Sequence, residues 1–185
     1  MILVCGLGNR GPEYAFTRHN MGYLVIDAFS KRYKVAVNRR SSGCRVGEHE
    51  DFLLVKPDTY MNLSGNPLSS LMKRRRVSAE EILLVHDDLD MEFGRIRIKW
   101  GGRDGGHKGV RSIAESLGSG LFYRLKVGIG RDPSMEPEAY VLSFFYEREK
   151  DRLKEVLDVA AEAVHAFIFQ GKEKAMSIYN RNMDW

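Results

Sequence analysis

A chain of 185 residues is long enough for one domain with a full hydrophobic core and too short for two comfortable ones. Its hydrophobic content of 43% and charged content of 29% are ordinary for a globular protein and exclude a disordered chain. The formal net charge of +4 is compatible with an anionic partner but does not require one. The two cysteines, Cys5 and Cys44, form neither a metal-ligand spacing nor a disulfide framework.

No segment of the sequence indicates export or membrane insertion. The apolar N-terminus is only five residues long and leads into a glycine-rich loop, which does not fit a signal peptide. No apolar run approaches the roughly 20 residues that a bilayer span requires. We therefore expect a soluble, cytoplasmic protein without a membrane contact. The most basic stretch, Lys73–Arg76, is typical of a solvated helix face, although its charge is also compatible with a nucleic-acid contact.

Short apolar runs alternate with helical patterns along the chain, which predicts one α/β domain over residues 1–185. Asn20 is a candidate cap for the first helix, and Ser78 with Glu81 forms a capping box before a strand. The pattern predicts a strand over residues 1–5, a helix over 21–33, a hairpin over 44–57, a helix over 66–76, strands over 82–86 and 95–100, a helix over 110–118, a strand over 123–130, and a long helix from about residue 147 that is broken at Gly171.

The loop after the first strand contains Gly6, Gly8 and Gly11 in the spacing G-x-G-x-x-G of a dinucleotide-binding site. That fingerprint needs a helix directly after the glycines and an acidic residue at the end of a second strand. Here Pro12 and a polar stretch follow, so the helix begins too late, and Asp27 lies in a helical pattern. The glycines are better explained by a tight turn where the backbone leaves the sheet.

Polar side chains follow several of the predicted strands. Asn9 follows the first strand, Asn62 follows the hairpin and Asp87 follows ILLVH, while His19 and His107 lie in two glycine-rich loops. In an open α/β sheet, groups just past the carboxyl ends of the strands converge on one crevice. A histidine oriented by a carboxylate can take a proton from water, and carboxamides can donate to a developing oxyanion. The pattern thus favours hydrolysis without a covalent nucleophile.

Simpler explanations of the same residues stay open. A single histidine near a loop often serves packing or capping, and an asparagine at a loop start often serves a turn. The cluster HDDLD, residues 86–90, has the oxygen donors of a cation site, but no Gly or Glu follows at the spacing of a calcium loop. Pattern alone therefore leaves two possibilities, a histidine-dependent hydrolase and an RNA-linked domain, and it indicates no metal and no cofactor.

Five stretches resemble the bacterial-type peptidyl-tRNA hydrolase family in order and spacing: VCGLGNRGPEYAFTRHNMG, KPDTYMNLSG, EILLVHDDLD, GRIRIKWGGRDGGHKGVRSI and YRLKVGIGR. EAYVLSFF and the C-terminal helix extend the likeness to nearly the full length. The resemblance implies a twisted mixed β-sheet flanked by helices, and metal-independent hydrolysis of the ester that joins a peptide to the 3′ end of tRNA. It implies peptidyl-tRNA as the partner, no cofactor, and a monomer.

The resemblance also implies roles for individual positions. His19 would be the general base and Asp87 the carboxylate that orients it. Asn9 would hold the substrate near the base, and Asn62 would position the peptide or the water.

Further positions would contact the substrate. Tyr14 would line the site and contact the end of the tRNA or the peptide, and Met61 would wall the peptide groove. Lys99 and either Arg124 or Lys126 match basic positions that the family uses toward the tRNA backbone. Such contacts are salt-dependent and blind to sequence.

One position departs from the family. The second glycine loop, which carries His107 as a further substrate contact, reads GGHKG where the family has GGHNG. Lys108 thus replaces an asparagine, and a lysine can donate but cannot accept a hydrogen bond. It can turn outward to a tRNA phosphate, or donate to a peptide carbonyl and alter the peptide preference. The rival hypothesis is an RNA-binding protein on the same scaffold that no longer hydrolyses, and Lys108 is the one feature in its favour.

Overall fold

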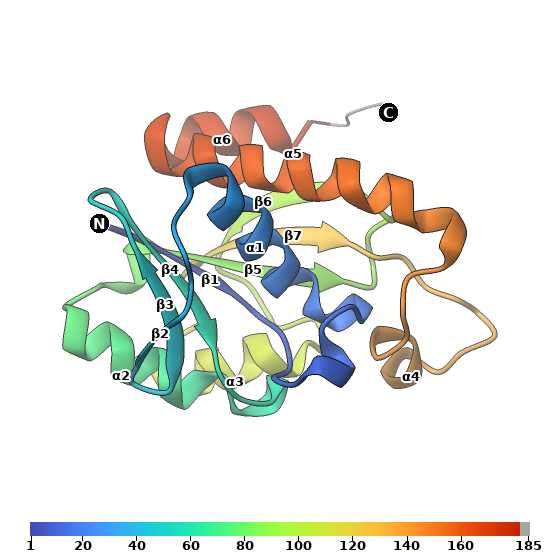
Figure 1. The fold of residues 1–185 in the computed structure, drawn as a ribbon, viewed down its shortest axis with the longest axis horizontal. Coiled ribbons are helices and arrows are strands. Elements are labelled where there is room, and N and C mark those ends of the chain that lie inside the picture. Colours follow the sequence, from blue (N-terminus) through green and yellow to red (C-terminus); the bar gives the residue numbers. More distant parts are fainter. Residues whose placement is uncertain (182–185) are drawn as a thin grey trace.

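Seven strands form one mixed sheet in the computed structural model, which describes residues 1–181 (Figure 1). The order across the sheet is β2-β3-β4-β1-β5-β7-β6. The four central strands are parallel, and an antiparallel pairing begins at each side, between β3 and β4 and between β6 and β7. The strands are β1 (Ile2–Gly6), β2 (Arg39–Ser41), β3 (Cys44–Glu48), β4 (Phe52–Pro57), β5 (Ile82–Asp88), β6 (Ile96–Trp100) and β7 (Tyr123–Gly128).

Helices cover both faces of the sheet, so each face has its own hydrophobic core (Figure 1). On one face, Val25 of α1 and Val164 of α5 pack with Leu125 of β7. On the other face, Leu68 of α2 and Ile113 of α3 pack against the sheet. The helices are α1 (Met21–Tyr33), α2 (Gly65–Arg75), α3 (Lys108–Leu117), α4 (Pro137–Val141), α5 (Lys150–Phe169) and α6 (Lys172–Tyr179).

Most predicted elements are present. The helix over 21–33 and the hairpin of β3 and β4 are confirmed, and the capping box of Ser78 and Glu81 closes a 3-10 turn before β5. Strand β5 continues beyond the predicted end and includes Asp87 itself. Two short elements, β2 and α4, were not expected, and α5 begins at Lys150 after a 3-10 turn.

Glycines at the first loop allow α1 to approach β1 closely. A Cβ atom at Gly6 would collide with the carbonyl oxygen of Gly22, and one at Gly8 would collide with the ring of Tyr23. The expectation that Gly6 and Gly8 serve a turn is therefore incomplete, because their open side is occupied by α1. Among the three glycines of this loop, only Gly11 has a positive φ, +107°, a backbone conformation that other residues rarely adopt.

The two edges of the sheet end differently. At the β6 edge, the side chain of Asn180 accepts from Ile98 N–H at 2.7 Å and donates to the Ile98 carbonyl at 2.8 Å. At the other edge, β2 is a three-residue strand that begins with Arg39 and Arg40. Among the helices of residues 1–181, none combines the length and apolar composition that a membrane span needs.

Candidate active site

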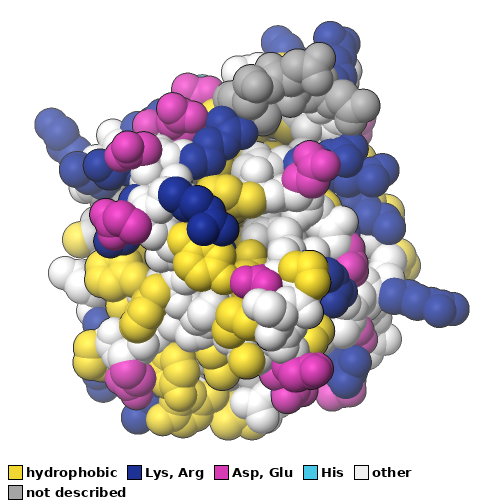
Figure 2. Space-filling view, turned by 90° about the vertical axis from the view of Figure 1, so that its right-hand side faces the viewer, with side chains coloured by type: hydrophobic (Ala, Val, Ile, Leu, Met, Phe, Trp, Pro, Cys, Tyr) yellow, Lys and Arg dark blue, Asp and Glu magenta, His cyan; other side chains and the backbone are white. Residues whose placement is uncertain are grey.

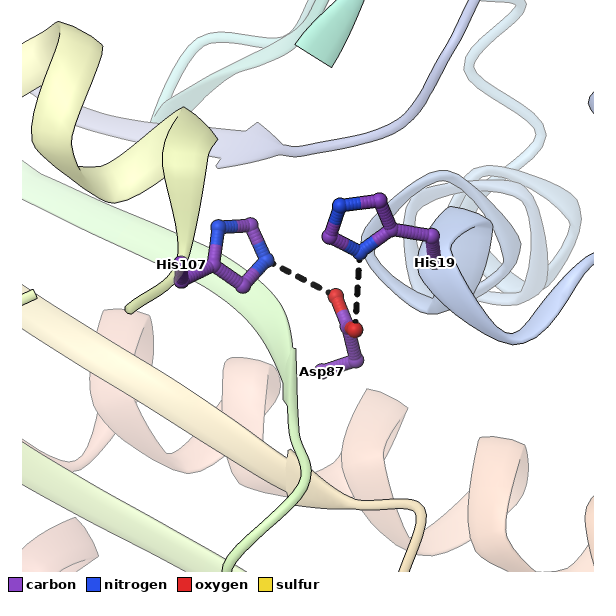
Figure 3. Close-up of side chains that lie close together, drawn as sticks. All are labelled: His19, Asp87 and His107. Carbon is purple, nitrogen blue, oxygen red and sulfur yellow. Dashed lines mark hydrogen bonds and ion pairs between the residues drawn. The ribbon is translucent and has the colours of Figure 1, made fainter. Parts of the chain in front are cut away.

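Two histidines and one aspartate meet at the carboxyl end of the parallel strands (Figure 3). Asp87 is next to the last residue of β5 and is buried. His19 comes from the 3-10 turn before α1, and His107 lies directly before α3. His19 Nδ1 lies 2.9 Å from Asp87 Oδ2, and His107 Nε2 lies 2.8 Å from Asp87 Oδ1. One carboxylate therefore binds both imidazoles, one on each oxygen.

The hydrogen bonds of His107 determine which of its nitrogens carries the proton. Its Nδ1 accepts from the backbone N–H groups of Gly109, at 3.2 Å, and Val110, at 3.3 Å. This side chain thereby caps α3, a role more often filled by Ser, Thr, Asp or Asn. Because Nδ1 accepts, the ring proton of neutral His107 is on Nε2 and is donated to Asp87.

His19 is oriented in the opposite sense. An ionised Asp87 can only accept, so the hydrogen bond between them requires a proton on His19 Nδ1. Its Nε2 is turned away from the carboxylate in Figure 3, and no residue within 1–181 forms a hydrogen bond with it. A neutral His19 thus presents a free lone pair at Nε2, which is what a general base needs.

The electrostatics of the pair favour an ionised carboxylate beside a basic imidazole. Burial alone would raise the pKa of Asp87, but the charges and hydrogen bonds of His19 and His107 hold that pKa well below its usual range. Burial likewise acts to lower the pKa of His19, but the charge and hydrogen bond of Asp87 outweigh it and raise that pKa above 6.5. The Lys108 ammonium opposes this rise.

A third histidine lies behind the site. His86, the neighbour of Asp87 in β5, is buried, and its ring centroid lies 4.9 Å from that of His107. Burial lowers the pKa of His86 to about 3, so the ring is neutral near pH 7. Its Nδ1 lies 2.7 Å from the Asp87 carbonyl oxygen. His86 therefore supports the backbone of Asp87 without adding charge to the site.

The predicted carboxamide at Asn9 lies in a fixed position. Its Oδ1 accepts from Met61 N–H at 2.7 Å, which leaves the Nδ2 hydrogens available to a substrate. The side chain of Asn20 holds the Asn9 backbone at both its N–H, 2.8 Å, and its carbonyl, 3.0 Å. Asn20 makes no capping hydrogen bond to α1, so the expectation of a cap is wrong.

The other predicted peptide contacts differ in exposure. Asn62 is exposed in the 3-10 turn after β4, and no hydrogen bond joins its side chain to the cluster of His19, Asp87 and His107. Met61 is buried and packs in the core between the sheet and helices α2 and α3. Tyr14 is partly buried and makes an edge-on contact with Tyr60, with centroids 6.4 Å apart.

Exposed apolar side chains accompany the site. Figure 2 shows them gathered on the side of the molecule that carries α4, and Phe16 and Phe144 are 68% and 61% exposed. A β-bridge between Thr17 and Phe144 holds these two segments side by side. Residue 16 lies two positions before the turn Arg18–Asn20 that carries His19, so this exposed apolar surface lies beside the site.

Lys108 begins α3 next to His107, and its side chain is 59% exposed. The Nζ atom lies 3.5 Å from Glu138 Oε1 of α4, and the Glu138 side chain is 83% exposed. An ion pair this open to solvent contributes little stability. Glu138 therefore holds the Lys108 ammonium only weakly.

The placement of Arg124 does not support a direct tRNA contact. Its side chain is buried, and its guanidinium donates to the carbonyls of Arg103, at 2.6 Å, and Gly102, with a longer bond of 3.4 Å to Gly120. These carbonyls belong to the loops on either side of α3. Arg124 therefore holds the backbone of the second glycine loop, whose end carries His107.

The remaining predicted basic positions, Lys99 and Lys126, share one face of the sheet with Arg97, which is not among the predicted tRNA contacts. Lys99 and Arg97 of β6 point to the same side as Lys126 of β7, because their neighbours Ile98 and Leu125 face the α1 and α5 core. Lys99 and Arg97 are exposed, and Lys126 is partly buried and lies 2.6 Å from Asp88 Oδ2. This side of β6 and β7 thus carries a cationic stripe made of Arg97, Lys99 and Lys126.

His19, Asp87 and His107 are also close enough together to suggest a metal site. However, His107 Nδ1 already accepts two backbone N–H groups, so the nitrogen facing Asp87 carries a proton and has no lone pair for a metal. Both carboxylate oxygens already accept from the histidines. The donor set therefore fits a hydrogen-bonded relay better than a set of metal ligands.

Comparisons with known proteins agree with this geometry. The family model described as peptidyl-tRNA hydrolase matches residues 3–184. The peptidyl-tRNA hydrolase of Thermodesulfovibrio yellowstonii is 40% identical over 98% of this chain and 100% of that protein. That of Citrifermentans bemidjiense is 41% identical over 96% and 97%. The crystal structure of the Acinetobacter baumannii enzyme superposes with a TM-score of 0.90 at 33% identity, covering 97% of this chain and 94% of that one. This chain therefore belongs to the peptidyl-tRNA hydrolase family.

Proposed function

We propose that this protein hydrolyses the ester that joins a peptide to the 3′ end of tRNA, releasing free tRNA during translation, without a metal ion or cofactor. The observation that carries the proposal is the pair of His19 and Asp87, in which the carboxylate fixes the imidazole with its Nε2 free. The full-length similarity to peptidyl-tRNA hydrolases supports the choice of substrate.

The chemistry needs a base, a water and an oxyanion donor. His19 Nε2 takes a proton from water while the water oxygen attacks the ester carbonyl carbon. The Nδ2 hydrogens of Asn9 donate to the oxyanion of the tetrahedral intermediate. The carbon–oxygen bond to the ribose then breaks, and His19 returns its proton to the leaving ribose oxygen. The products are a peptide carboxylic acid, which loses its proton to solvent, and tRNA with a free terminal hydroxyl group.

The partner in this proposal is the sugar–phosphate backbone of the tRNA. Lys99 and Lys126 would contact its phosphates through the cationic stripe, with the same strength for every tRNA sequence. Tyr14 would contact the terminal nucleotide or the peptide, and Asn62 would contact the peptide or the water. Lys108 would bind a phosphate or a peptide carbonyl in place of Glu138. We expect the protein to act as a monomer.

The rival is a protein that binds RNA on this scaffold without hydrolysing it. The cationic stripe would serve both functions equally. His19, Asp87 and Asn9 favour hydrolysis, since binding of RNA alone does not need a buried carboxylate that orients an imidazole.

The test is release of tRNA from an N-acetyl-aminoacyl-tRNA by the purified protein in EDTA, with His19→Ala measured alongside. We expect turnover that survives chelation and falls about 100-fold or more in the variant, because general-base catalysis is lost. A rate abolished by EDTA and restored by a divalent ion would overturn the metal-free mechanism. Tight binding of tRNA without turnover would identify the RNA-binding rival.

A further inference from the structure

The residue directly before the proposed base is a fully buried arginine. Arg18 pairs with Glu149 through two parallel hydrogen bonds, Nη1 to Oε2 and Nη2 to Oε1, each 2.8 Å long. Its Nε lies 3.2 Å from the Ser143 hydroxyl oxygen, and its backbone N–H donates to the Ser143 carbonyl at 3.0 Å. The side chain and the backbone N–H of Arg18 thus both bind residues 143–149, which precede α5.

Aromatic rings surround the same guanidinium. Its central carbon lies 4.4 Å from the ring centroid of Tyr140, 4.7 Å from that of Tyr146 and 5.0 Å from that of Phe145. Three rings and a bidentate carboxylate leave the guanidinium only one orientation, because its planar fork matches the carboxylate and its faces match the rings. Residues 140–149 therefore hold the Arg18 side chain in one orientation.

A buried ion pair is weak evidence for added stability, since the cost of removing two charges from water can exceed their attraction. The ion pair of Arg18 and Glu149 does fix the position of the backbone at Arg18. The catalytic orientation of His19, the next residue, depends on that position. Arg18, His19 and Asn20 form a single 3-10 turn, which is too short to hold its own orientation. Within it, Arg18 binds the segment before α5, His19 binds Asp87, and Asn20 binds the Asn9 backbone.

We propose that Arg18 is a positioning residue, which with Glu149 fixes the turn so that His19 keeps its Nδ1 on Asp87 and its Nε2 toward the substrate. Arg18 acts through His19 and does not touch the substrate. The inference rests on the proposed function for its kinetic consequence. Its structural consequence, the fixed pairing of His19 with Asp87, can be measured independently of activity.

The experiment uses the double variant Arg18→Met/Glu149→Gln, which removes both buried charges together and leaves an amide oxygen to accept from Tyr146 N–H, as Glu149 does at 3.0 Å. We expect kcat to fall at least about 10-fold with KM nearly unchanged, since misplacement of a catalytic group slows the chemical step. In an NMR titration the pKa of the His19 ring should fall toward 6.5 as its contact with Asp87 loosens. Asp87, His107 and Lys108, which also surround His19, are unchanged in this variant.

Two further variants complete the test. Arg18→Lys keeps the charge but loses the fork, so it should give intermediate values of kcat and of the His19 pKa, and it serves if the double variant does not fold. Arg32→Gln/Glu162→Gln removes an exposed pair of 3.9 Å between α1 and α5, and it should change neither quantity. A folded variant with unchanged kcat and His19 pKa overturns the proposal, and so does a rise in KM alone. If the wild-type protein releases no tRNA, the proposed function fails, while the titration still decides the positioning role.

Discussion

The imidazole of His19 donates from Nδ1 to Oδ2 of Asp87 across 2.9 Å, which leaves Nε2 as the nitrogen that accepts a proton. This relationship depends on Asp87 having only acceptors, since the second imidazole, His107, also donates to it. The site is thus built around a carboxylate that cannot give a proton to either ring.

Asp87→Asn should therefore be more damaging than its small change in shape suggests. The amide oxygen would face His107, which must donate, so the amide NH2 would face His19 and force its proton onto Nε2. We expect kcat to fall about 100-fold or more. Asp87→Ala leaves His19 free to keep its proton on either nitrogen and should retain more activity than Asp87→Asn. Steady-state kinetics of both folded variants decides this, and the reverse order would contradict the tautomer argument.

Lys108→Asn should move the acid limb of the pH–rate profile to higher pH. The base is active when unprotonated, so the limb of kcat/KM follows the pKa of His19 in the free enzyme. The Lys108 ammonium lowers that pKa, and its removal lets the pKa rise. The variant should lose activity near pH 6 and little near pH 8. Lys154→Asn, an exposed lysine of α5, is the matched control. A limb that stays in place or moves to lower pH would show that Lys108 does not act on His19.

Alanine substitutions at Lys99 and Arg124 should have different effects on the binding of tRNA and on its salt dependence. Lys99→Ala removes one exposed cation of the stripe, so tRNA binding should weaken equally for different tRNAs and the slope of log K against log salt should fall by about one. Arg124→Ala should leave that slope unchanged, because its guanidinium faces backbone carbonyls. It should cost about 2 kcal/mol or more through unsatisfied carbonyls, which lowers the Tm by roughly 4–8 °C. A reduced salt slope for Arg124→Ala would restore its direct role.

Because of His86, the free energy of unfolding should fall as the pH decreases below 6.5. Its pKa is about 3 when folded and 6.5 when unfolded, so between these values the unfolded chain binds more protons. This contribution is complete above pH 6.5 and is lost as the pH falls toward 3, by at most about 1.4 kcal/mol per pH unit. Urea unfolding at pH 7 and pH 5 should show a smaller difference for His86→Leu than for the wild-type protein. Equal differences in the two proteins would mean that His86 titrates alike in both states.

Local patterns are enough to predict much of this fold, and the exceptions have physical causes. The helical spacing of apolar residues over 21–33 predicts α1. The polar turn between β3 and β4 predicts the hairpin. Strand β2 has no apolar alternation, because it consists of Arg39, Arg40 and Ser41, and it forms only by pairing with β3. Helix α4 has five residues, and Tyr140 is its only buried one. Both elements depend on distant contacts.

In the site, too, some features follow from local patterns and others depend on distant contacts. His19 and Asp87 follow from the rule that polar groups after parallel strands share a crevice. The bond from His107 to Asp87 joins residues 20 positions apart, and the burial of Arg124 depends on the register of β5 beside β7, which places Leu84 opposite Arg124. No local pattern contains that register. For this reason an arginine that holds a loop cannot be told from one that faces RNA by sequence position alone.

The carboxamide of Asn180 has a consequence for how copies of this protein meet. An outermost strand usually offers free N–H and C=O groups that can recruit a strand from another molecule and seed a growing aggregate. Asn180 occupies both groups of Ile98 as a one-residue imitation of a neighbouring strand. At the opposite border, the strand is three residues long and begins with two arginines, which repel another copy of itself. Asn180 thus blocks strand pairing at the centre of β6, and the short, arginine-rich β2 disfavours it at the other edge.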